Sequence, residues 1–345
     1  MLARPDNRIV AVREGETILD AGLREGLALP FECRNGGCGQ CKATLAYGEV
    51  DYGAYQNDAL PQAERAAGKI LTCCATPRGD IEIEYRPAKV PGGIRAREWT
   101  ASVESLDLLA PDVMRVRLSL EGGERIAFYA GQYINILLED GAKRSFSFAT
   151  APQASERIEL HIRRIPGGRY SGHVFERLRA GDKLRFEGPL GAFFLREDSD
   201  KPIIFVAGST GFAPVKSMLE YAFSRGMRRR MLLYWGTKNL KDMYLAELPR
   251  QWQREHDNFS FVPVLSEPMP EDGWQGRTGL VHEAILADFP SLAGHQVYAC
   301  GSTAMVEAAH PAFRARGLAQ DDCFADAFRP APRSRPEMAR LGGTA

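Results

Sequence analysis

The sequence predicts a multidomain protein that combines α+β and α/β folds. Three observations predict this. Short alternating strands surround a segment rich in cysteine and glycine, CRNGGCGQC, in the first 90 residues. From about residue 99, short strands follow one another between Gly- and Pro-rich turns, as in an antiparallel β-barrel. From about residue 199, apolar strands alternate with helical patterns, which is typical of a parallel sheet covered by helices.

Length and charge limit the class of protein. A chain of 345 residues is long enough for about two or three domains, so its cysteines are not needed to staple a small fold. Lys plus Arg and Asp plus Glu both number 44, and this zero formal charge argues against a nucleic-acid partner. No apolar run approaches the roughly 18 residues of a membrane span. We therefore expect a cytoplasmic protein that does not insert into a membrane.

The first domain is predicted over residues 1–90. RIVAV, KATLAYGEV and DIEIEYR alternate as strands do, and ETILDAGLREGL predicts a short helix before the cysteine segment. After it, RPAKVPGGIRARE has prolines, a Gly-Gly pair and charges without periodicity, so residues 91–98 are predicted to be a linker.

The cysteine segment has the spacing of an iron–sulfur site. Cys33, Cys38 and Cys41 form the pattern C-x4-C-x2-C, and a fourth thiol follows at Cys73 or Cys74. With Cys73, 31 residues separate it from Cys41, which matches the plant-type spacing for a [2Fe-2S] cluster. Seven cysteines without a secretion signal do not suggest a disulfide framework.

The residues between these cysteines suit such a cluster. A cluster with four thiolates is negatively charged, so the loop has to turn backbone N–H groups toward the sulfurs. Gly36, Gly37 and Gly39 permit the positive φ angles that this requires, and Arg34 adds a cation. The alternative is a structural zinc site, which four cysteines also form, although zinc ribbons usually present two C-x2-C knuckles.

The β-barrel domain, predicted over residues 99–198, contains two signals for a phosphate-bearing cofactor. RSFSFAT places Arg144, Phe146 and Ser147 on one strand. Further on, RRIPGGRYSGHVF puts Gly168 in a turn and Ser171 at a predicted helix N-terminus. Such a terminus offers free N–H groups and partial positive charge, which suit a pyrophosphate.

The third domain, predicted over residues 199–330, has two loops of similar design. PIIFVA leads through GSTGFAP into a helix, and HQVYAC leads through GSTAM into another. Both loops follow parallel strands, at the sheet edge where ligands bind, although the G-x-G-x-x-G fingerprint is absent. The candidate binding residues in these loops are Gly208, Thr210, Gly211, Cys300 and Gly301. The tail over 331–345 lacks apolar spacing and is predicted to be disordered.

The order of these motifs resembles a known family. R-x-F-S, G-G-x-x-S, GPLG, GSTGFAP, YWG and CGS follow one another as in the ferredoxin-NADP reductase superfamily. The cysteine segment with its distal LTC resembles plant-type ferredoxins, which have a β-grasp fold, and this favours Cys73 as the fourth ligand. A ferredoxin fused in front resembles the reductases that serve bacterial oxygenases and, most of all, CDP-6-deoxy-Δ3,4-glucoseen reductases. The resemblance covers about residues 5–328.

The resemblance implies roles for individual residues. Arg144 would pair with FAD phosphate, Phe146 would lie against the flavin, and Ser147 would sit near its N5 atom. Gly168 and Ser171 would hold the pyrophosphate. Cys300 would flank the nicotinamide, and Asp326 and Phe328, in CFADAF, would line the flavin edge.

These roles together predict an electron-transfer enzyme. Electrons would pass from NADH, with NADPH as an alternative, through FAD and the cluster to a separate acceptor protein that docks transiently. The resemblance implies an oxygenase or a sugar-nucleotide dehydrase as that acceptor. Two other hypotheses are a non-catalytic iron–sulfur or zinc protein with a sensor or assembly role, and a direct reductase of a small acceptor.

Overall fold

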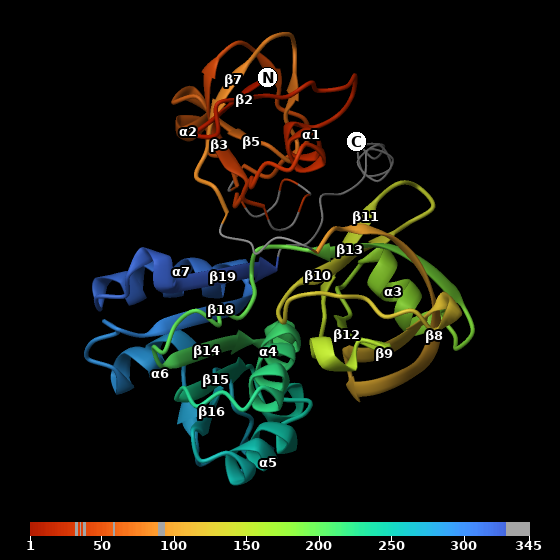
Figure 1. Cartoon of the computed structure of the whole chain (residues 1–345). Helices are drawn as coiled ribbons and strands as arrows, with labels where there is room; N and C mark the ends of the chain where they lie inside the picture. Colours follow the sequence, from red (N-terminus) through yellow and green to blue (C-terminus); the bar gives the residue numbers. More distant parts are fainter. Residues whose placement is uncertain (32–33, 35, 37–38, 58, 89–93, 329–345) are drawn as a thin grey trace, which may run out of the picture. The chain divides into compact units, whose positions relative to one another are not determined.

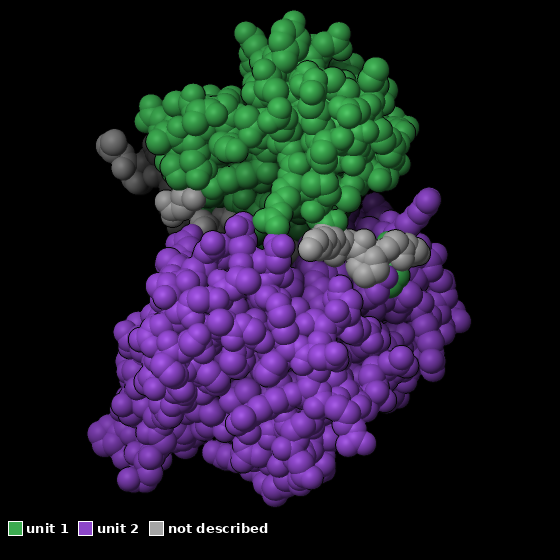
Figure 2. Space-filling view, turned by 60° about the vertical axis from the view of Figure 1, so that its left-hand side comes forward, with its two compact units in different colours: residues 1–94, 138–144, 329–345 green, residues 95–137, 145–328 purple. Residues whose placement is uncertain are grey.

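The structure is a computed structural model that describes residues 1–31, 34, 36, 39–57, 59–88 and 94–328. The chain divides into two compact units, which Figure 2 colours separately. One contains residues 1–94 with 138–144, and the other contains residues 95–137 with 145–328. The predicted tail lies outside the described residues. Among the helices of the described part, none is long and apolar enough to cross a lipid bilayer.

The first unit has a five-stranded mixed sheet in the order β2-β1-β7-β3-β5. Strand β1 pairs parallel with β7, whereas β3 pairs antiparallel with both β5 and β7. This agrees with the expected β-grasp class. The elements are β1 (Leu2–Arg4), β2 (Arg8–Ile9), α1 (Ile18–Arg24), β3 (Lys42–Tyr47), β4 (Val50–Asp51), α2 (Gln62–Ala66), β5 (Lys69–Leu71), β6 (Thr76–Pro77) and β7 (Glu82–Glu84).

Four elements of this unit escaped the sequence prediction: β1, α2, β5 and β6. Helix α2 has no buried residue, so it lacks the apolar period that reveals a helix. Strand β1 forms a short hairpin with β2 around Asn7, whose φ is 52°. The predicted strand RIVAV is limited to Arg8–Ile9, the two residues that pair with Ala3 and Leu2 of β1.

The second unit begins with a six-stranded antiparallel sheet in the order β11-β10-β13-β8-β9-β12. In β9 the buried residues Val116, Leu118 and Leu120 alternate with less buried ones, as expected for a barrel wall with one apolar face. The elements are β8 (Arg97–Ala110), β9 (Val113–Leu120), η1 (Glu121–Gly123), β10 (Tyr133–Leu137), β11 (Lys143–Ser147), η2 (Pro152–Ala154), β12 (Arg157–Arg163), α3 (Arg169–Glu176) and β13 (Lys183–Leu190).

The start of β8 corrects the predicted linker. Arg97 and Glu98 were predicted to belong to the linker, but they pair with Gly188 and Glu187 of β13. The neighbouring Trp99 adds a side-chain contact to the same strand, since its Nε1 donates a hydrogen bond to the carbonyl of Gly188, 3.0 Å away. Residues 91–93 of the linker lie outside the described residues.

The second unit continues with a six-stranded parallel sheet in the order β17-β16-β15-β14-β18-β19. Its elements are β14 (Ile203–Gly208), η3 (Ser209–Gly211), α4 (Phe212–Ser224), β15 (Met231–Thr237), η4 (Leu240–Asp242), α5 (Glu247–Glu255), β16 (Phe259–Leu265), η5 (Pro270–Asp272), β17 (Arg277–Thr278), α6 (Val281–Asp288), β18 (Gln296–Ser302), α7 (Thr303–Ala315), η6 (Gln320–Asp322) and β19 (Cys323–Phe328).

Both faces of this sheet are covered, as the alternation of strands and helices predicts. Phe205 and Ala207 of β14 join a core with α4 and α5, and Ile204 and Val206 join a second core with α6 and α7 (Figure 1). A strand that is buried on both faces has a continuous apolar sequence, and PIIFVA is such a sequence. The predicted doubly covered parallel sheet is therefore confirmed.

Candidate functional site

The cysteine site of the first unit brings two of the predicted ligands together. Cys41 immediately precedes β3 and Cys73 follows β5, and the pairing of Lys42 with Leu71 closes the long gap between them. The two Sγ atoms are 3.3 Å apart and both residues are buried. Cys33 and Cys38 lie outside the described residues.

The backbone around these thiols fits a compact anionic cluster. Gly36 and Gly39 both have φ of 73°, in the left-handed region that favours glycine. A Cβ on Gly36 would lie 2.7 Å from both the carbonyl of Ala54 and the Sγ of Cys74, and one on Gly39 would lie 2.9 Å from the carbonyl of Ala59. Only glycine therefore lets residues 36 and 39 approach their neighbours this closely.

A feature that the sequence did not reveal is the support given by α1. The backbone N–H of Leu19 donates to the carbonyl of Thr72 at 2.8 Å, and that of Ile18 donates to the carbonyl of Ala75 at 3.0 Å. The start of the helix thus holds the segment that carries Cys73. Arg34, expected as a cation beside the cluster, forms an ion pair with Asp20 of α1, which compensates its charge.

The flavin candidates of the barrel lie on β11 and at the start of α3. Arg144, Phe146 and Ser147 are all on β11, and Ser147 is buried. The ring of Phe146 lies 5.7 Å from that of Tyr170 in the first turn of α3. These two aromatic side chains bring β11 and α3 together, as a cofactor that contacts both elements requires.

Gly168 and Ser171 shape the turn before α3. A Cβ on Gly168 would lie 2.6 Å from the Oγ of Ser171 and 2.9 Å from the carbonyl of Ile165. The Ser171 hydroxyl accepts a hydrogen bond from the Ile165 N–H at 3.0 Å, so this side chain stabilises its own turn. Any pyrophosphate contact here therefore depends on the first-turn N–H groups of α3, which have no acceptor within the helix.

Tyr170 is a residue that the sequence interpretation overlooked. Its hydroxyl is buried and has no hydrogen-bond partner among the described residues. Burial raises the pKa of Tyr170, so the phenol stays protonated and can donate. An unsatisfied donor beside a helix N-terminus fits the phosphate-bearing part of FAD, and an aromatic residue inside GGRYS was the available signal.

The two loops of the parallel sheet pack directly against each other. Strands β14 and β18 are neighbours, with Ala207 opposite Cys300. A Cβ on Gly211 would overlap the carbonyl oxygen of Cys300, and a Cβ on Gly301 would lie 2.9 Å from the Cα of Gly208. The glycines predicted to give a phosphate access are thus required for loop-to-loop packing, and Thr210 lies between them in η3.

The remaining candidates lie beside Cys300. This cysteine is fully buried, and its Sγ lies 3.9 Å from the Oδ2 of Asp326, its partner on β19. Phe328 ends β19 and is partly buried. Ser302 caps α7 by accepting from the N–H of Met305 at 3.3 Å.

Ser209 in the first loop has an unusual backbone conformation. Its φ is 53°, which is uncommon for a residue with a side chain. The indole of Trp235 on β15 donates a hydrogen bond to the Ser209 carbonyl at 3.0 Å and fixes this conformation. The tryptophan of the YWG motif therefore shapes the loop.

Comparison with known proteins matches each part of the chain. Residues 3–78 match the family described as 2Fe-2S iron-sulfur cluster binding domain. Residues 100–195 match the oxidoreductase FAD-binding domain, and residues 205–311 match the oxidoreductase NAD-binding domain. Fold and site together define a flavin-dependent iron–sulfur oxidoreductase that uses a pyridine nucleotide.

Full-length relatives share this arrangement. The chain is 40% identical over 314 residues to the CDP-6-deoxy-L-threo-D-glycero-4-hexulose-3-dehydrase reductase of Yersinia pestis, covering 91% of this chain and 93% of that protein. It is 37% identical to terephthalate 1,2-dioxygenase, reductase component 2, of a Comamonas species, covering 92% and 94%. The crystal structure of the Amycolatopsis cytochrome P450 reductase GcoB aligns with a TM-score of 0.83 at 36% identity, covering 96% and 98%.

The chain therefore belongs to the ferredoxin-fused members of the ferredoxin-NADP reductase superfamily. It is an NAD(P)H-dependent reductase that uses FAD and a [2Fe-2S] cluster and passes electrons to a separate acceptor. The predicted family, fold class and cofactors are confirmed. The oxidoreductase FAD- and NAD-binding domains argue against a non-catalytic sensor or zinc protein.

Proposed function

We propose that electrons enter from NADH at the loops 208–211 and 300–302, reach FAD on the barrel, and leave through a cluster bound by four cysteines. The observation that carries this proposal is the direct packing of Gly211 on Cys300, which joins two loops at the ligand-binding edge of the sheet. The proposed cluster ligands are Cys33, Cys38, Cys41 and Cys73. The contact between the thiols of Cys41 and Cys73 supports Cys73 over Cys74.

The protein's contribution is to bind and orient the cofactors. When bound, FAD would supply the conversion between two-electron hydride transfer from NADH and one-electron transfer to the cluster. Phe146 and Ser147 would contact the flavin, and Arg144 its phosphate. Gly168, Tyr170 and Ser171 would shape the pyrophosphate site. Cys300 would border the nicotinamide, and Asp326 and Phe328 would line the flavin edge.

The proposed preference for NADH rests on a charge pair at the end of β15. NADPH carries an additional 2′-phosphate, which requires a free cation. Lys238 follows β15 directly, but its Nζ lies 3.4 Å from the Oε1 of Glu267. The carboxylate compensates the lysine and would repel a phosphate.

The proposed acceptor is a separate oxygenase or sugar-nucleotide dehydrase. The names of the relatives support both classes, since they include reductases of a hexulose dehydrase and of aromatic dioxygenases. Docking would be small and transient, as is usual between electron-transfer partners. Adding a purified enzyme of each class, with its substrate, and measuring NADH-dependent product tells the two apart.

The visible spectrum of the isolated protein before and after anaerobic NADH tests the whole route. Absorbance from both flavin and cluster should be present and should decrease on reduction. Protein that contains zinc and no iron contradicts the proposal. A Cys73→Ser variant that lacks the cluster but keeps full turnover with the natural acceptor would instead support direct reduction of a small acceptor.

A further inference from the structure

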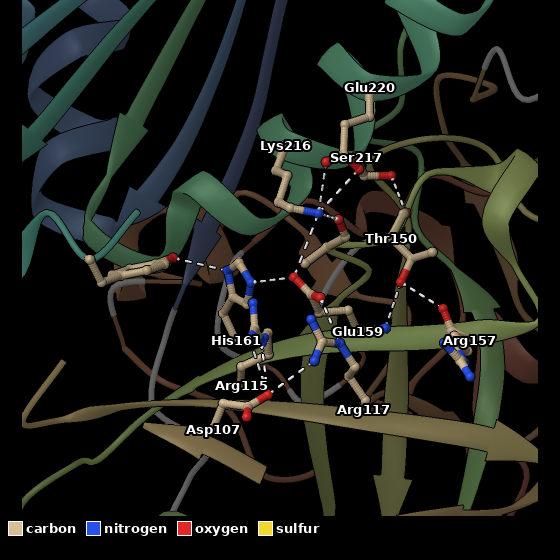
Figure 3. A network of polar contacts seen from close by, with 12 residues as sticks. Asp107, Arg115, Arg117, Thr150, Arg157, Glu159, His161, Lys216, Ser217 and Glu220 are labelled. Carbon is tan, nitrogen blue, oxygen red and sulfur yellow. Dashed lines mark hydrogen bonds and ion pairs between the residues drawn. The ribbon is translucent and has the colours of Figure 1, made fainter. Parts of the chain in front are cut away.

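The junction between the β-barrel and the parallel sheet contains a buried lysine (Figure 3). Lys216 on α4 is only 9% exposed. Its Nζ lies 3.0 Å from the carbonyl oxygen of Ala149, 3.0 Å from a carboxylate oxygen of Glu220 and 3.5 Å from one of Glu159. An ammonium group has three donors, and here it meets three acceptors, of which Ala149 and Glu159 belong to the barrel. A buried charge persists only with such partners.

The next residue of α4 makes a second contact of the same kind. Ser217 is fully buried, and its hydroxyl donates to the carbonyl of Thr150 at 2.6 Å. Successive side chains of the helix thus bind successive carbonyls of the barrel. The carbonyl positions are themselves fixed, because the N–H of Ala149 donates to the carbonyl of Glu159 at 2.8 Å.

These contacts lie close to both proposed reaction partners. Ala149 and Thr150 come two and three residues after Ser147, the last residue of the flavin-binding strand β11. Lys216 comes five residues after Gly211, which corresponds to about 8 Å along a helix axis. A rigid helix therefore connects the nicotinamide loop to the segment that continues the flavin-binding strand.

A second link runs in parallel through His161 of β12. Its Nε2 lies 3.0 Å from the Oε1 of Glu159, and its Nδ1 lies 3.1 Å from the hydroxyl of Tyr244. The Tyr244 ring packs edge-on against Trp235, the residue that holds Ser209 of the nicotinamide loop. This link also ends at that loop.

The charges of this network are mutually consistent. Burial alone would raise the pKa of Glu159, but the hydrogen bond to His161 and the charge of Lys216 lower it to about 2. Burial lowers the pKa of His161 and raises that of Tyr244. A neutral imidazole therefore donates from Nε2 to the carboxylate and accepts at Nδ1 from the phenol. Arg117 contacts the other carboxylate oxygen at 3.3 Å.

We propose that Lys216 and Ser217 are positioning residues that set the distance between the flavin and the nicotinamide. The inference rests on the proposed binding of the nicotinamide at loops 208–211 and 300–302. Hydride transfer depends steeply on this distance, and a misplacement of about 1 Å can cost about 100-fold in rate. Without the two contacts, α4 and its loop are free to shift against β11, while the residues proposed to bind FAD are unchanged.

The experiment uses the complete holoprotein with Lys216→Met, which keeps the length of the side chain and removes its charge. Anaerobic stopped-flow should show that the limiting rate of flavin reduction by NADH falls by about 10- to 100-fold. The dissociation constant for NADH should change by less than about threefold, since the nucleotide contacts remain. Long-wavelength charge-transfer absorbance, which reports stacking of NAD⁺ on reduced flavin, should weaken while FAD content stays constant.

Lys183→Met is the matched control. It removes an exposed barrel pair, Lys183 with Glu121 at 2.8 Å, and should change neither the rate nor the absorbance. Ser217→Ala is the milder second variant, which decides the question if Lys216→Met does not fold, and should lower the limiting rate by about 3- to 10-fold. Unchanged rate and absorbance in a folded, FAD-loaded variant overturn the inference. Wild-type flavin that NADH fails to reduce would instead contradict the proposed function.

Discussion

The cysteine site and the barrel–sheet junction are both buried, but different groups hold them together. At the cysteine site, the N–H groups of Ile18 and Leu19 bind the segment around Cys73. At the junction, the ion pair between Lys216 and Glu159 links α4 to the barrel. Backbone contacts leave no space for an added atom, whereas the carboxylate of Glu159 has several charged partners. We therefore expect the loss of a cluster ligand, or a clash at a backbone contact, to affect the protein more than the neutralisation of this one carboxylate.

The largest effect is expected for Cys73→Ser. Three remaining thiolates do not complete the ligand set, so iron content should fall by about tenfold or more and cluster absorbance should disappear. NADH should still reduce the FAD, because the proposed nucleotide residues and all the proposed flavin residues except Arg144 lie in the second unit. Iron analysis and anaerobic spectra measure both results.

Cys74→Ser provides the matched control for that prediction. Its Sγ lies 3.5 Å from that of Cys73, so the two thiols are chemically similar and close together. The Cys74→Ser protein should retain its cluster. If it loses iron and Cys73→Ser does not, the fourth ligand is Cys74, and the packing of Gly36 against that thiol would need a different explanation.

The cysteine site could be predicted from the sequence because its residue types have few other uses together. Closely spaced cysteines and glycines have a narrow chemistry, and the spacing of Cys41 and Cys73 already indicated the cluster. The support from α1 could not be predicted, because backbone N–H groups are the same in every residue. Which loop receives them depends on tertiary structure.

The junction could not be predicted because lysine, glutamate and histidine serve many purposes. His161 has no recognisable partner in the sequence. Its partners Glu159 and Tyr244 are 2 and 83 residues away, and no spacing rule connects them. The loop glycines form an intermediate case, since the sequence indicates Gly211 as a candidate binding residue but does not indicate its packing against Cys300.

The second-largest effect is expected for Gly211→Ala. Like the segment around Cys73, this site depends on close contacts between backbone atoms. The new Cβ would overlap the carbonyl of Cys300, so the two loops must separate. Overpacking of this kind costs about 1–3 kcal/mol in the free energy of unfolding. The limiting rate of flavin reduction should also fall by about tenfold or more.

Urea unfolding and stopped-flow reduction measure the effects of Gly211→Ala. Gly172→Ala in α3 is the control, because an added Cβ there meets nothing within 4 Å. That change should be neutral or stabilise the protein by up to about 1 kcal/mol, since alanine favours helix. Equal behaviour of the two variants would show that the loops separate without cost.

A smaller effect is expected at the charge-held junction, for Glu159→Gln. The pKa of Glu159 is lowered from 4.5 to about 2, so its ionised form stabilises the folded protein at neutral pH. This lowering corresponds to about 3 kcal/mol at most. The contribution is complete above the unfolded pKa of 4.5 and is lost as the pH falls toward 2.

The stability difference between wild type and Glu159→Gln should therefore be largest at pH 7 and shrink from pH 5 to pH 3. Urea midpoints at several pH values measure it. Glu98→Gln, which breaks an exposed pair with Arg185, should change stability by less than about 1 kcal/mol. A difference that does not vary with pH would mean that Glu159 is not held ionised by its partners.

The smallest effect is expected for Glu267→Gln, because its pair with Lys238 is exposed on both sides, at 65% and 67%. Exposed pairs contribute about 1 kcal/mol or less, since water screens them. Without the Glu267 carboxylate, Lys238 can bind the 2′-phosphate of NADPH. The ratio of kcat/KM for NADH over NADPH should therefore fall by about three- to tenfold. Steady-state kinetics with both nucleotides measure this ratio, and Glu121→Gln on the barrel should leave it unchanged. If the ratio of kcat/KM for NADH over NADPH stays constant or increases, the adenosine of the nucleotide binds away from the end of β15. In that case the exposed pair of Lys238 with Glu267 does not determine the choice of nucleotide.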